Sequence, residues 1–231
     1  TTPKEWQRRI INTVTEMLSI IRSRKFTPSA AARLFGKLDF INQTLFGRVG
    51  RVGMLPIKKR QTSDSESGVG FELKASLVWM IQILLFCPDR EMSTQLMPRR
   101  PVLLYTDGSS DVGRDPPHVV GAVVIMPETG RIFYTNCPVP QEVVSDWIPS
   151  KQHIYLVELF AGPVALDTFS DLLEERDVIH FVDNNSALGA LVKGYSSKED
   201  AIKIVAEYWL RAMKHRMLIY VDRVESKSNI A

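Results

Sequence analysis

The sequence contains few cysteines and no long hydrophobic segment. Cys87 and Cys137 are its only cysteines, too few for a disulfide framework or a four-cysteine zinc site. No run of 18 apolar residues occurs, and no basic segment followed by an apolar one begins the chain. We therefore expect neither a membrane span nor a secretory signal. A reducing intracellular compartment follows, without a distinction between cytoplasm, nucleus and organelle.

Internal repeats and low-complexity tracts are also absent, and the chain starts at Thr1 rather than at a methionine. The missing methionine indicates a processed or excerpted piece of a longer protein. Hydrophobic residues make up 45% and charged residues 24% of the 231 residues. These are ordinary values for a globular protein with a real core, and the length fits one large domain or two small ones.

Charge is distributed unevenly along the chain. Residues 1–100 hold 17 basic and 8 acidic residues, a net charge of +9, whereas residues 101–231 hold 12 and 18, a net charge of −6. A basic part beside an acidic part favours a surface that grips a polyanion next to a carboxylate-rich site. Pro98-Arg99-Arg100-Pro101 is the predicted boundary, which gives a basic helical region over 1–100 and a second domain over 101–231.

Three helices are predicted in the first region. The first begins with the start signal Thr2-Pro3-Glu5, in which Thr2 is the expected N-cap, and continues to Ile21. The second begins at Thr27-Pro28 and has apolar residues at helical spacing as far as Val49, although four glycines weaken it. Residues 61–68 are polar and indicate a loop. The third helix is expected over 71–86.

The densest basic cluster of the chain begins at the end of the second helix and continues into the segment before the third. It consists of Arg48, Arg51, Lys58, Lys59 and Arg60. Such a cluster can neutralise phosphates and bind nucleic acid without sequence preference, in a salt-dependent way. A solvated surface is the alternative interpretation of the same residues.

The second region alternates strands with helices in the order β-β-β-α-β-α-β. The expected strands are residues 102–105, 119–125, 131–135, 178–182 and 217–221, and the expected helices are residues 155–173, 186–192 and 198–216. The first three strands form an antiparallel meander. We predict an α/β fold in which a five-stranded mixed sheet carries helices on its faces.

Three acidic residues occupy particular places in this pattern. Asp107 and Asp183 are placed at the ends of two strands, and Glu158 lies on the helix between them, beside small residues that allow close packing. Taken singly, each is explained as a turn or surface residue. Together they would converge at one sheet edge. Three converging carboxylates repel one another unless a divalent cation lies among them, so the set predicts Mg²⁺ or Mn²⁺.

The segments around these acids carry a resemblance to a known family. They are Tyr105-Thr106-Asp107-Gly108-Ser109, Tyr155-Leu156-Val157-Glu158-Leu159 and Phe181-Val182-Asp183-Asn184-Asn185-Ser186. They resemble the acidic blocks of ribonuclease H, in particular that at the C-terminal end of retroelement reverse transcriptases. Residues 34–56 resemble the helical connection between polymerase and nuclease in those enzymes. The resemblance implies a ribonuclease H-like sheet preceded by an all-helical region.

The resemblance also implies an activity. It is metal-dependent endonucleolytic hydrolysis of the RNA strand of an RNA·DNA hybrid, with Asp107, Glu158 and Asp183 holding two ions that activate a water. The hybrid would be held by its backbone and groove shape. We expect the neighbouring Ser109, Asn184 and Ser186 to contact the nucleic acid. An RNA·DNA hybrid or a structured RNA is the expected partner, with other protein chains in a larger complex as a further possibility.

The chain departs from the family pattern at several points. The pattern places a fourth acid immediately after Ala231, where Asp222 and Glu225 do not match it, and a histidine in the 226–229 loop that is missing here. Gly162-Pro163 predicts a kink in the Glu158 helix, or its start there, because Pro163 cannot donate to Leu159. The polymerase palm and fingers are absent, so polymerisation is not expected.

Two functional hypotheses therefore stand beside each other. The first is an active ribonuclease H module, which the complete set of three acids favours. The second is a retroelement-derived, non-catalytic nucleic-acid-binding or scaffold subunit of an RNA-containing assembly, which the missing fourth acid and polymerase favour. A transposase or integrase of the same fold would need an acid on a helix roughly 35 residues past Asp183. Basic and apolar residues occupy that zone, so we set this hypothesis aside.

Overall fold

The computed structural model describes residues 3–63, 67–88, 90, 100–111, 113–150 and 153–231. The chain divides into two compact units, a helical unit over Thr1–Asp89 and a sheet unit over Arg90–Ala231. The predicted boundary at 98–101 and the predicted N-cap Thr2 lie wholly or partly outside the described residues. Within these residues, no helix has the length and apolar character needed to cross a membrane.

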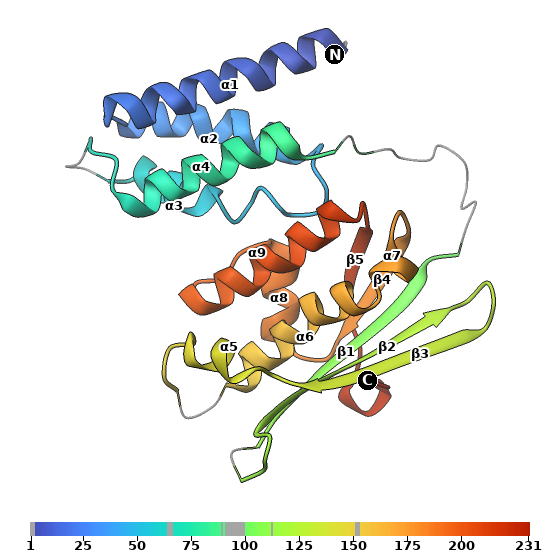
Figure 1. Cartoon of the computed structure of the whole chain (residues 1–231). Helices are drawn as coiled ribbons and strands as arrows, with labels where there is room; N and C mark the ends of the chain where they lie inside the picture. Colours follow the sequence, from blue (N-terminus) through green and yellow to red (C-terminus); the bar gives the residue numbers. More distant parts are fainter. Residues whose placement is uncertain (1–2, 64–66, 89, 91–99, 112, 151–152) are drawn as a thin grey trace. The chain divides into compact units, whose positions relative to one another are not determined.

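The helical unit contains α1 (Pro3–Ser23), α2 (Pro28–Asn42), α3 (Met54–Gln61) and α4 (Phe71–Phe86) (Figure 1). The predicted start of α2 is confirmed, because Thr27 caps the helix by accepting a hydrogen bond from the Ala30 amide. Its predicted extension to Val49 is wrong. A Cβ on Gly50 would lie 1.8 Å from Asn42 Oδ1, so the chain turns back closely after Asn42, and α3 is a separate helix.

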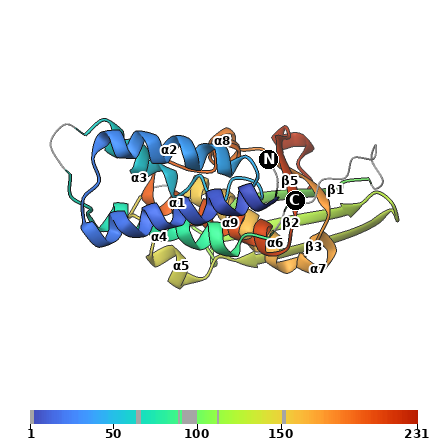
Figure 2. The ribbon, with the colours of Figure 1, turned by 90° about the horizontal axis from the view of Figure 1, so that it is seen from above.

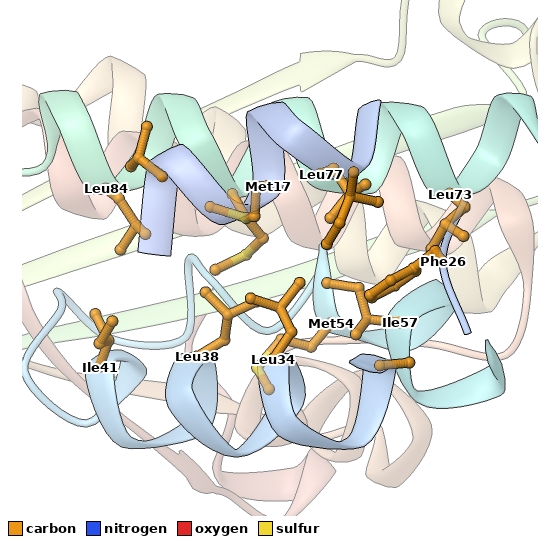
Figure 3. Close-up of a cluster of buried hydrophobic side chains, with 14 residues drawn as sticks. Met17, Phe26, Leu34, Leu38, Ile41, Met54, Ile57, Leu73, Leu77 and Leu84 are labelled. Carbon is orange, nitrogen blue, oxygen red and sulfur yellow. The ribbon is translucent and has the colours of Figure 1, made fainter. Parts of the chain in front are cut away.

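Figure 3 shows the core of the helical unit. Side chains from all four helices meet there, and Met17, Leu34, Leu38, Ile57 and Leu77 are fully buried. The residues come from helical positions three or four apart, which place them on one face of each helix. The apolar spacing of the sequence therefore identifies this core correctly, and Leu45 and Val49 are also buried although they lie in turns.

The sheet unit is built on five strands in the order β3-β2-β1-β4-β5. The strands are β1 (Val102–Ser110), β2 (His118–Met126), β3 (Arg131–Pro138), β4 (Asp177–Val182) and β5 (Leu218–Arg223). The β1–β2 and β2–β3 pairs are antiparallel, whereas β4 runs parallel to β1 and to β5. The predicted fold class, a ribonuclease H-like five-stranded mixed sheet with an all-helical region before it, is confirmed.

The helices of this unit are α5 (Gln141–Ser145), α6 (Ile154–Thr168), α7 (Ser170–Leu173), α8 (Asn185–Lys193) and α9 (Glu199–Lys214), with a short 3₁₀ helix at Ser226–Ser228. Helix α6 packs on β1 and β2, α8 packs on β4 and β5, and α9 packs on α6. The alternative that the helix starts at Pro163 is wrong, since α6 begins at Ile154 and continues through Pro163 to Thr168. Packing of α6 on the sheet offsets the one backbone hydrogen bond that Pro163 cannot form.

A buried polar contact fixes the central strands against α9. His180 on β4 shares hydrogen bonds with Thr106 Oγ1 on β1 and with the Tyr208 hydroxyl on α9, each at 2.8 Å. Burial lowers the pKa of His180 to about 3, so the ring is neutral. Gly162 makes room for this arrangement, because a Cβ there would lie 2.9 Å from the Tyr208 ring.

Leu159 on α6 is fully buried, which provides a direct check of the packing. Leu159→Ala is expected to lower the free energy of unfolding of the sheet unit by about 2–5 kcal/mol, since it leaves a cavity in a close-packed core. Chemical denaturation followed by circular dichroism measures this loss. Val192→Ala removes a side chain that is 42% exposed on α8 and should change stability by less than about 0.5 kcal/mol.

Candidate metal centre

The first two acids are placed by the central pair of strands. Parallel pairing of β1 with β4 ends at Tyr105 and Phe181, and Asp107 and Asp183 each follow two residues later. Asp183 directly follows β4, as predicted. Asp107 does not end its strand, because β1 continues to Ser110 through antiparallel pairing with β2. The two carboxylates nevertheless leave neighbouring strands at the same level.

Glu158 reaches this level because α6 lies unusually close to β1. A Cβ on Gly108 would lie 2.7 Å from the Glu158 amide nitrogen and 2.9 Å from its Cα. Real side chains do not fit such a space, so Gly108 is required for the contact. Glu158 stands in the second turn of α6 and is directly opposite Gly108, the residue after Asp107.

The three carboxylates converge. One oxygen from each of Asp107, Glu158 and Asp183 lies within 4.8 Å of the other two, and all three side chains are half-buried. No other group of three or more potential metal ligands occurs among the described residues. The convergence that the sequence predicts for these three residues is thus present in the structure.

The electrostatics of the cluster disfavour three negative charges. Burial is the largest cause that raises the pKa of Glu158 to about 7; the nearby Asp183 and Asp107 add to it, and a hydrogen bond from Asn184 opposes it. Burial and Asp183 likewise raise the pKa of Asp107, against a hydrogen bond from the Gly108 amide. Carboxylates held together in this way are destabilised without a cation among them.

The donor set fits a divalent cation of the Mg²⁺ or Mn²⁺ type. Such hard cations prefer carboxylate oxygens and take six or more oxygen ligands, so three carboxylates leave positions for water. Asp183 Oδ1 supports this fit, because it is buried and has no hydrogen-bond partner among the described residues. A buried carboxylate oxygen without a partner is costly unless a cation or water satisfies it.

The residues expected to contact nucleic acid beside the acids have different surroundings. Ser109 on β1 and Ser186 on α8 are exposed. Asn184 instead caps α8, where its Oδ1 accepts hydrogen bonds from the amides of Ser186 and Ala187, and its Nδ2 donates to Glu158 Oε1 at 3.2 Å. The Asn184 side chain is therefore occupied in positioning Glu158 and starting α8, a role that the sequence motif does not reveal.

The predicted basic cluster is divided by the fold. Arg48, Lys58 and Lys59 are exposed and Arg51 is half-buried, but Arg60 is buried and donates from Nη2 to the Gly68 carbonyl. Arg60 thus holds the segment before α4, and its guanidinium is buried against a carbonyl instead of exposed for phosphate binding as the charge pattern predicts. The α3 helix places Lys58 and Lys59 on its outer side and Arg60 on its inner side, a difference that charge counting does not detect.

The segment after β5 lies against β1 and β2, next to the strand position of Asp107. Asn229 Nδ2 donates to the Thr106 carbonyl at 3.1 Å, and the carbonyl carbon of Ala231 lies 3.5 Å from the position of a Cβ on Gly121. Gly121 is paired with Asp107, and the C-terminus lies beside β2 in Figure 1 and Figure 2. Asp222 and Glu225 are exposed and do not join the cluster.

No family model and no curated protein matches the chain. Among solved structures, it is similar to the N-terminal RNase H domain of a Mycobacterium tuberculosis protein fused to maltose-binding protein. The identity is 18%, the match covers 56% of this chain and 85% of that chain, and the TM-score is 0.42. RNase H1 from Halobacterium salinarum is 16% identical, with 56% of this chain and 89% of that chain covered and a TM-score of 0.42. The prototype foamy virus protease-reverse transcriptase is 13% identical, with 75% of this chain and 26% of that chain covered and a TM-score of 0.39.

Proposed function

We propose that the sheet unit hydrolyses the RNA strand of RNA·DNA hybrids in a reaction that depends on Mg²⁺ or Mn²⁺, as the nuclease part of a reverse transcriptase-like protein. The observation that carries this proposal is the convergence of Asp107, Glu158 and Asp183 within 4.8 Å. The sequence motifs around the three acids supply the expected substrate.

The residues of the site divide the work between them. Asp107 and Asp183 would hold the cation from two adjacent strands, and Glu158 would complete the set from α6. Asn184 keeps Glu158 Oε1 oriented toward the cluster through its 3.2 Å hydrogen bond. A bound divalent ion, or a pair of them, would supply an activated water and stabilise the charge that develops on the phosphate. No side chain of the cluster needs to act as a nucleophile.

A groove lined by Tyr155 of the Glu158 helix and by Ser186, three residues after Asp183, is where we place the nucleic acid. It has a volume of about 430 Å³ and lies between the start of α6, α8 and the segment that joins α8 to α9. Lys193 and Lys198 supply positive charge, and Tyr155, Ser186 and Ser196 supply hydroxyl groups. Basic and hydroxyl side chains are the usual donors to phosphate and sugar oxygens, which position a duplex without reading its sequence.

Cleavage of a labelled hybrid tests the proposal. The purified full chain is incubated with an RNA·DNA hybrid in Mg²⁺ and then in Mn²⁺, with the label on the RNA strand or on the DNA strand. We expect cleavage of the RNA strand alone, lost in Asp107→Asn and retained in Asp222→Asn, which removes an exposed acid outside the cluster. Metal-dependent cleavage that survives in Asp107→Asn would refute the site. Binding without cleavage in either metal would favour the non-catalytic scaffold.

An added carboxylate after Ala231 is expected to raise the activity. Ala231 lies against Gly121, the partner of Asp107, so an aspartate appended there is placed near the cluster as a further ligand. We expect the cleavage rate at limiting Mg²⁺ to increase by about tenfold or more. The matched control appends asparagine, which has the same shape without the charge. Equal rates for the two extended chains would show that the added residue does not reach the metal.

The exposed part of the basic cluster provides a separate prediction. Charge reversal at two exposed positions, Arg48→Glu with Lys58→Glu, is expected to weaken hybrid binding and to make its salt dependence less steep, since fewer counterions are released on binding. Fluorescence anisotropy over a series of salt concentrations measures both effects. The control is Arg33→Glu on α2, an exposed arginine outside the cluster. An unchanged salt slope would make the cluster an ordinary solvated surface.

A further inference from the structure

A cavity of about 400 Å³ opens at one end of the helical unit, and none of the five residues of the basic cluster lines it. It lies where α1 ends and α4 begins, and Figure 1 shows these two helix ends together. Arg22 in the last turn of α1, Arg24 just beyond it and Lys74 on α4 line the cavity. No acidic residue lines it within the described part of the chain, so the cavity is positively charged.

The nearest acid in the sequence is engaged elsewhere. Glu72 in the first turn of α4 forms a salt bridge of 3.3 Å with Lys59 on α3. The other salt bridge of the helical unit, as far as the structure describes it, joins Lys37 to Glu16. Among the described residues, Arg22, Arg24 and Lys74 therefore form no salt bridge that would neutralise the cavity.

The start of α4 adds hydrogen-bond donors to the same place. Its N-cap is Gly70, which has no side chain to accept the first amide groups. Gly70 and Phe71 both line the cavity. The first amides of a helix have no partner inside the helix, and the helix dipole makes this end positive. A phosphate group in the cavity would be held by the arginines and lysine together with these amides.

An aromatic ring stands beside this positive cavity. Phe71 is 89% exposed, although it is large and apolar. Ile21 and Val69 provide further apolar surface on the cavity wall. A ring exposed next to basic side chains is the arrangement with which proteins bind single-stranded nucleic acid, since the phosphate meets the charge and the base stacks on the ring.

We propose that this cavity binds a nucleotide unit of single-stranded nucleic acid, with the phosphate held by Arg22, Lys74 and the α4 amides and the base stacked on Phe71. The site lies in the helical unit and uses none of the carboxylates of the metal centre. It therefore goes beyond hydrolysis and does not depend on it.

Binding of a short fluorescent single-stranded oligonucleotide to the full chain tests the proposal. Fluorescence anisotropy measures it in EDTA, which removes divalent ions so that the metal centre does not contribute to binding. Phe71→Ala should raise Kd by about fivefold or more, because one stacked base is lost. The matched control is Phe86→Ala, which removes a ring that is 76% exposed at the opposite end of the same helix. Equal values of Kd for these two variants would overturn the proposal.

A second pair of variants tests the phosphate contact. Arg22→Ala with Lys74→Ala should weaken binding and reduce the salt slope, whereas Arg8→Ala with Arg33→Ala makes the same charge change at exposed positions away from the cavity and should do neither. Arg24 is left in place because its backbone is left-handed, with φ 54°. Two further results would refute a nucleotide site: equal effects of the two double variants, or equal affinity for a duplex of the same sequence. Neither depends on whether the sheet unit cleaves hybrids.

Discussion

Glu158→Gln is expected to remove metal-dependent cleavage and, at the same time, to make the metal-free protein more stable at alkaline pH. The loss of activity follows from the loss of one of three charged ligands, and we expect a fall of about a hundredfold to a thousandfold in rate. The gain in stability follows from the cost of burying the Glu158 charge beside Asp183 and Asp107. A residue kept for the fold alone would not show these opposite effects.

The raised pKa of Glu158 determines how the stability of the metal-free protein changes with pH. Burial raises the pKa of Glu158 from 4.5 to about 7 in the folded protein, so folding favours the protonated form. The resulting stabilisation is complete below the pKa of the unfolded chain, 4.5, and is lost as the pH rises through 7. Because the carboxyl is only half-buried, solvent screening reduces the effect to about 1–2 kcal/mol. Glu158→Gln should remove this loss between pH 4.5 and 7.

Thermal unfolding in EDTA across this pH range measures the difference. Mg²⁺ should raise the Tm of the original chain at pH 8, since binding to the folded state stabilises it, and should raise that of Glu158→Gln far less. The control is Glu142→Gln, which neutralises an exposed acid on α5. If Glu158→Gln were less stable than the original chain in EDTA at pH 8, the view that the cluster is strained without a cation would be wrong.

Periodicity predicts most elements of this fold and fails where tertiary contacts decide their ends. The apolar spacing of residues 71–86 predicts α4 with its correct ends. The same spacing overextends α2 to Val49, because Leu45 and Val49 are buried through turns and not through a helical face. Strand β1 is longer than expected, since its polar second half is held by pairing with β2. These outcomes depend on neighbours that a local pattern does not contain.

In the metal centre, too, the sequence identifies features set by a residue's own element and misses those set by contacts between elements. The three acids are recognisable because each stands at a point where an element brings it to the sheet edge. Capping of α8 by Asn184 is a local interaction, whereas its hydrogen bond to Glu158 is not recognisable from sequence, because it needs the three-dimensional position of α6. Arg60 appears in the sequence as one of five basic residues, and only its burial against the Gly68 carbonyl separates it from them.

Gly108→Ala is expected to be among the most damaging single substitutions in the sheet unit, although it adds only one methyl group. The new Cβ would lie within 2.9 Å of the Glu158 amide nitrogen, its Cα and the Val157 carbonyl carbon. These are backbone atoms, so no side-chain rotation relieves the contact, and α6 must move away from β1. We expect a loss of about 3 kcal/mol or more in the free energy of unfolding, in the range of severe overpacking.

The same movement should open the metal centre, because it carries Glu158 away from Asp107 and Asp183. Isothermal titration with Mg²⁺ and denaturant unfolding together measure both effects in one variant. Gly189→Ala is the matched control for stability: a Cβ at Gly189 in α8 meets no atom within 4 Å, and alanine should stabilise that helix by up to about 1 kcal/mol. If Gly108→Ala left both the free energy of unfolding and the Mg²⁺ affinity unchanged, α6 would not be held against β1 at this point. The geometry that brings Glu158 to the two aspartates would then be wrong, since in this fold the distance between α6 and β1 sets the distance between the carboxylates.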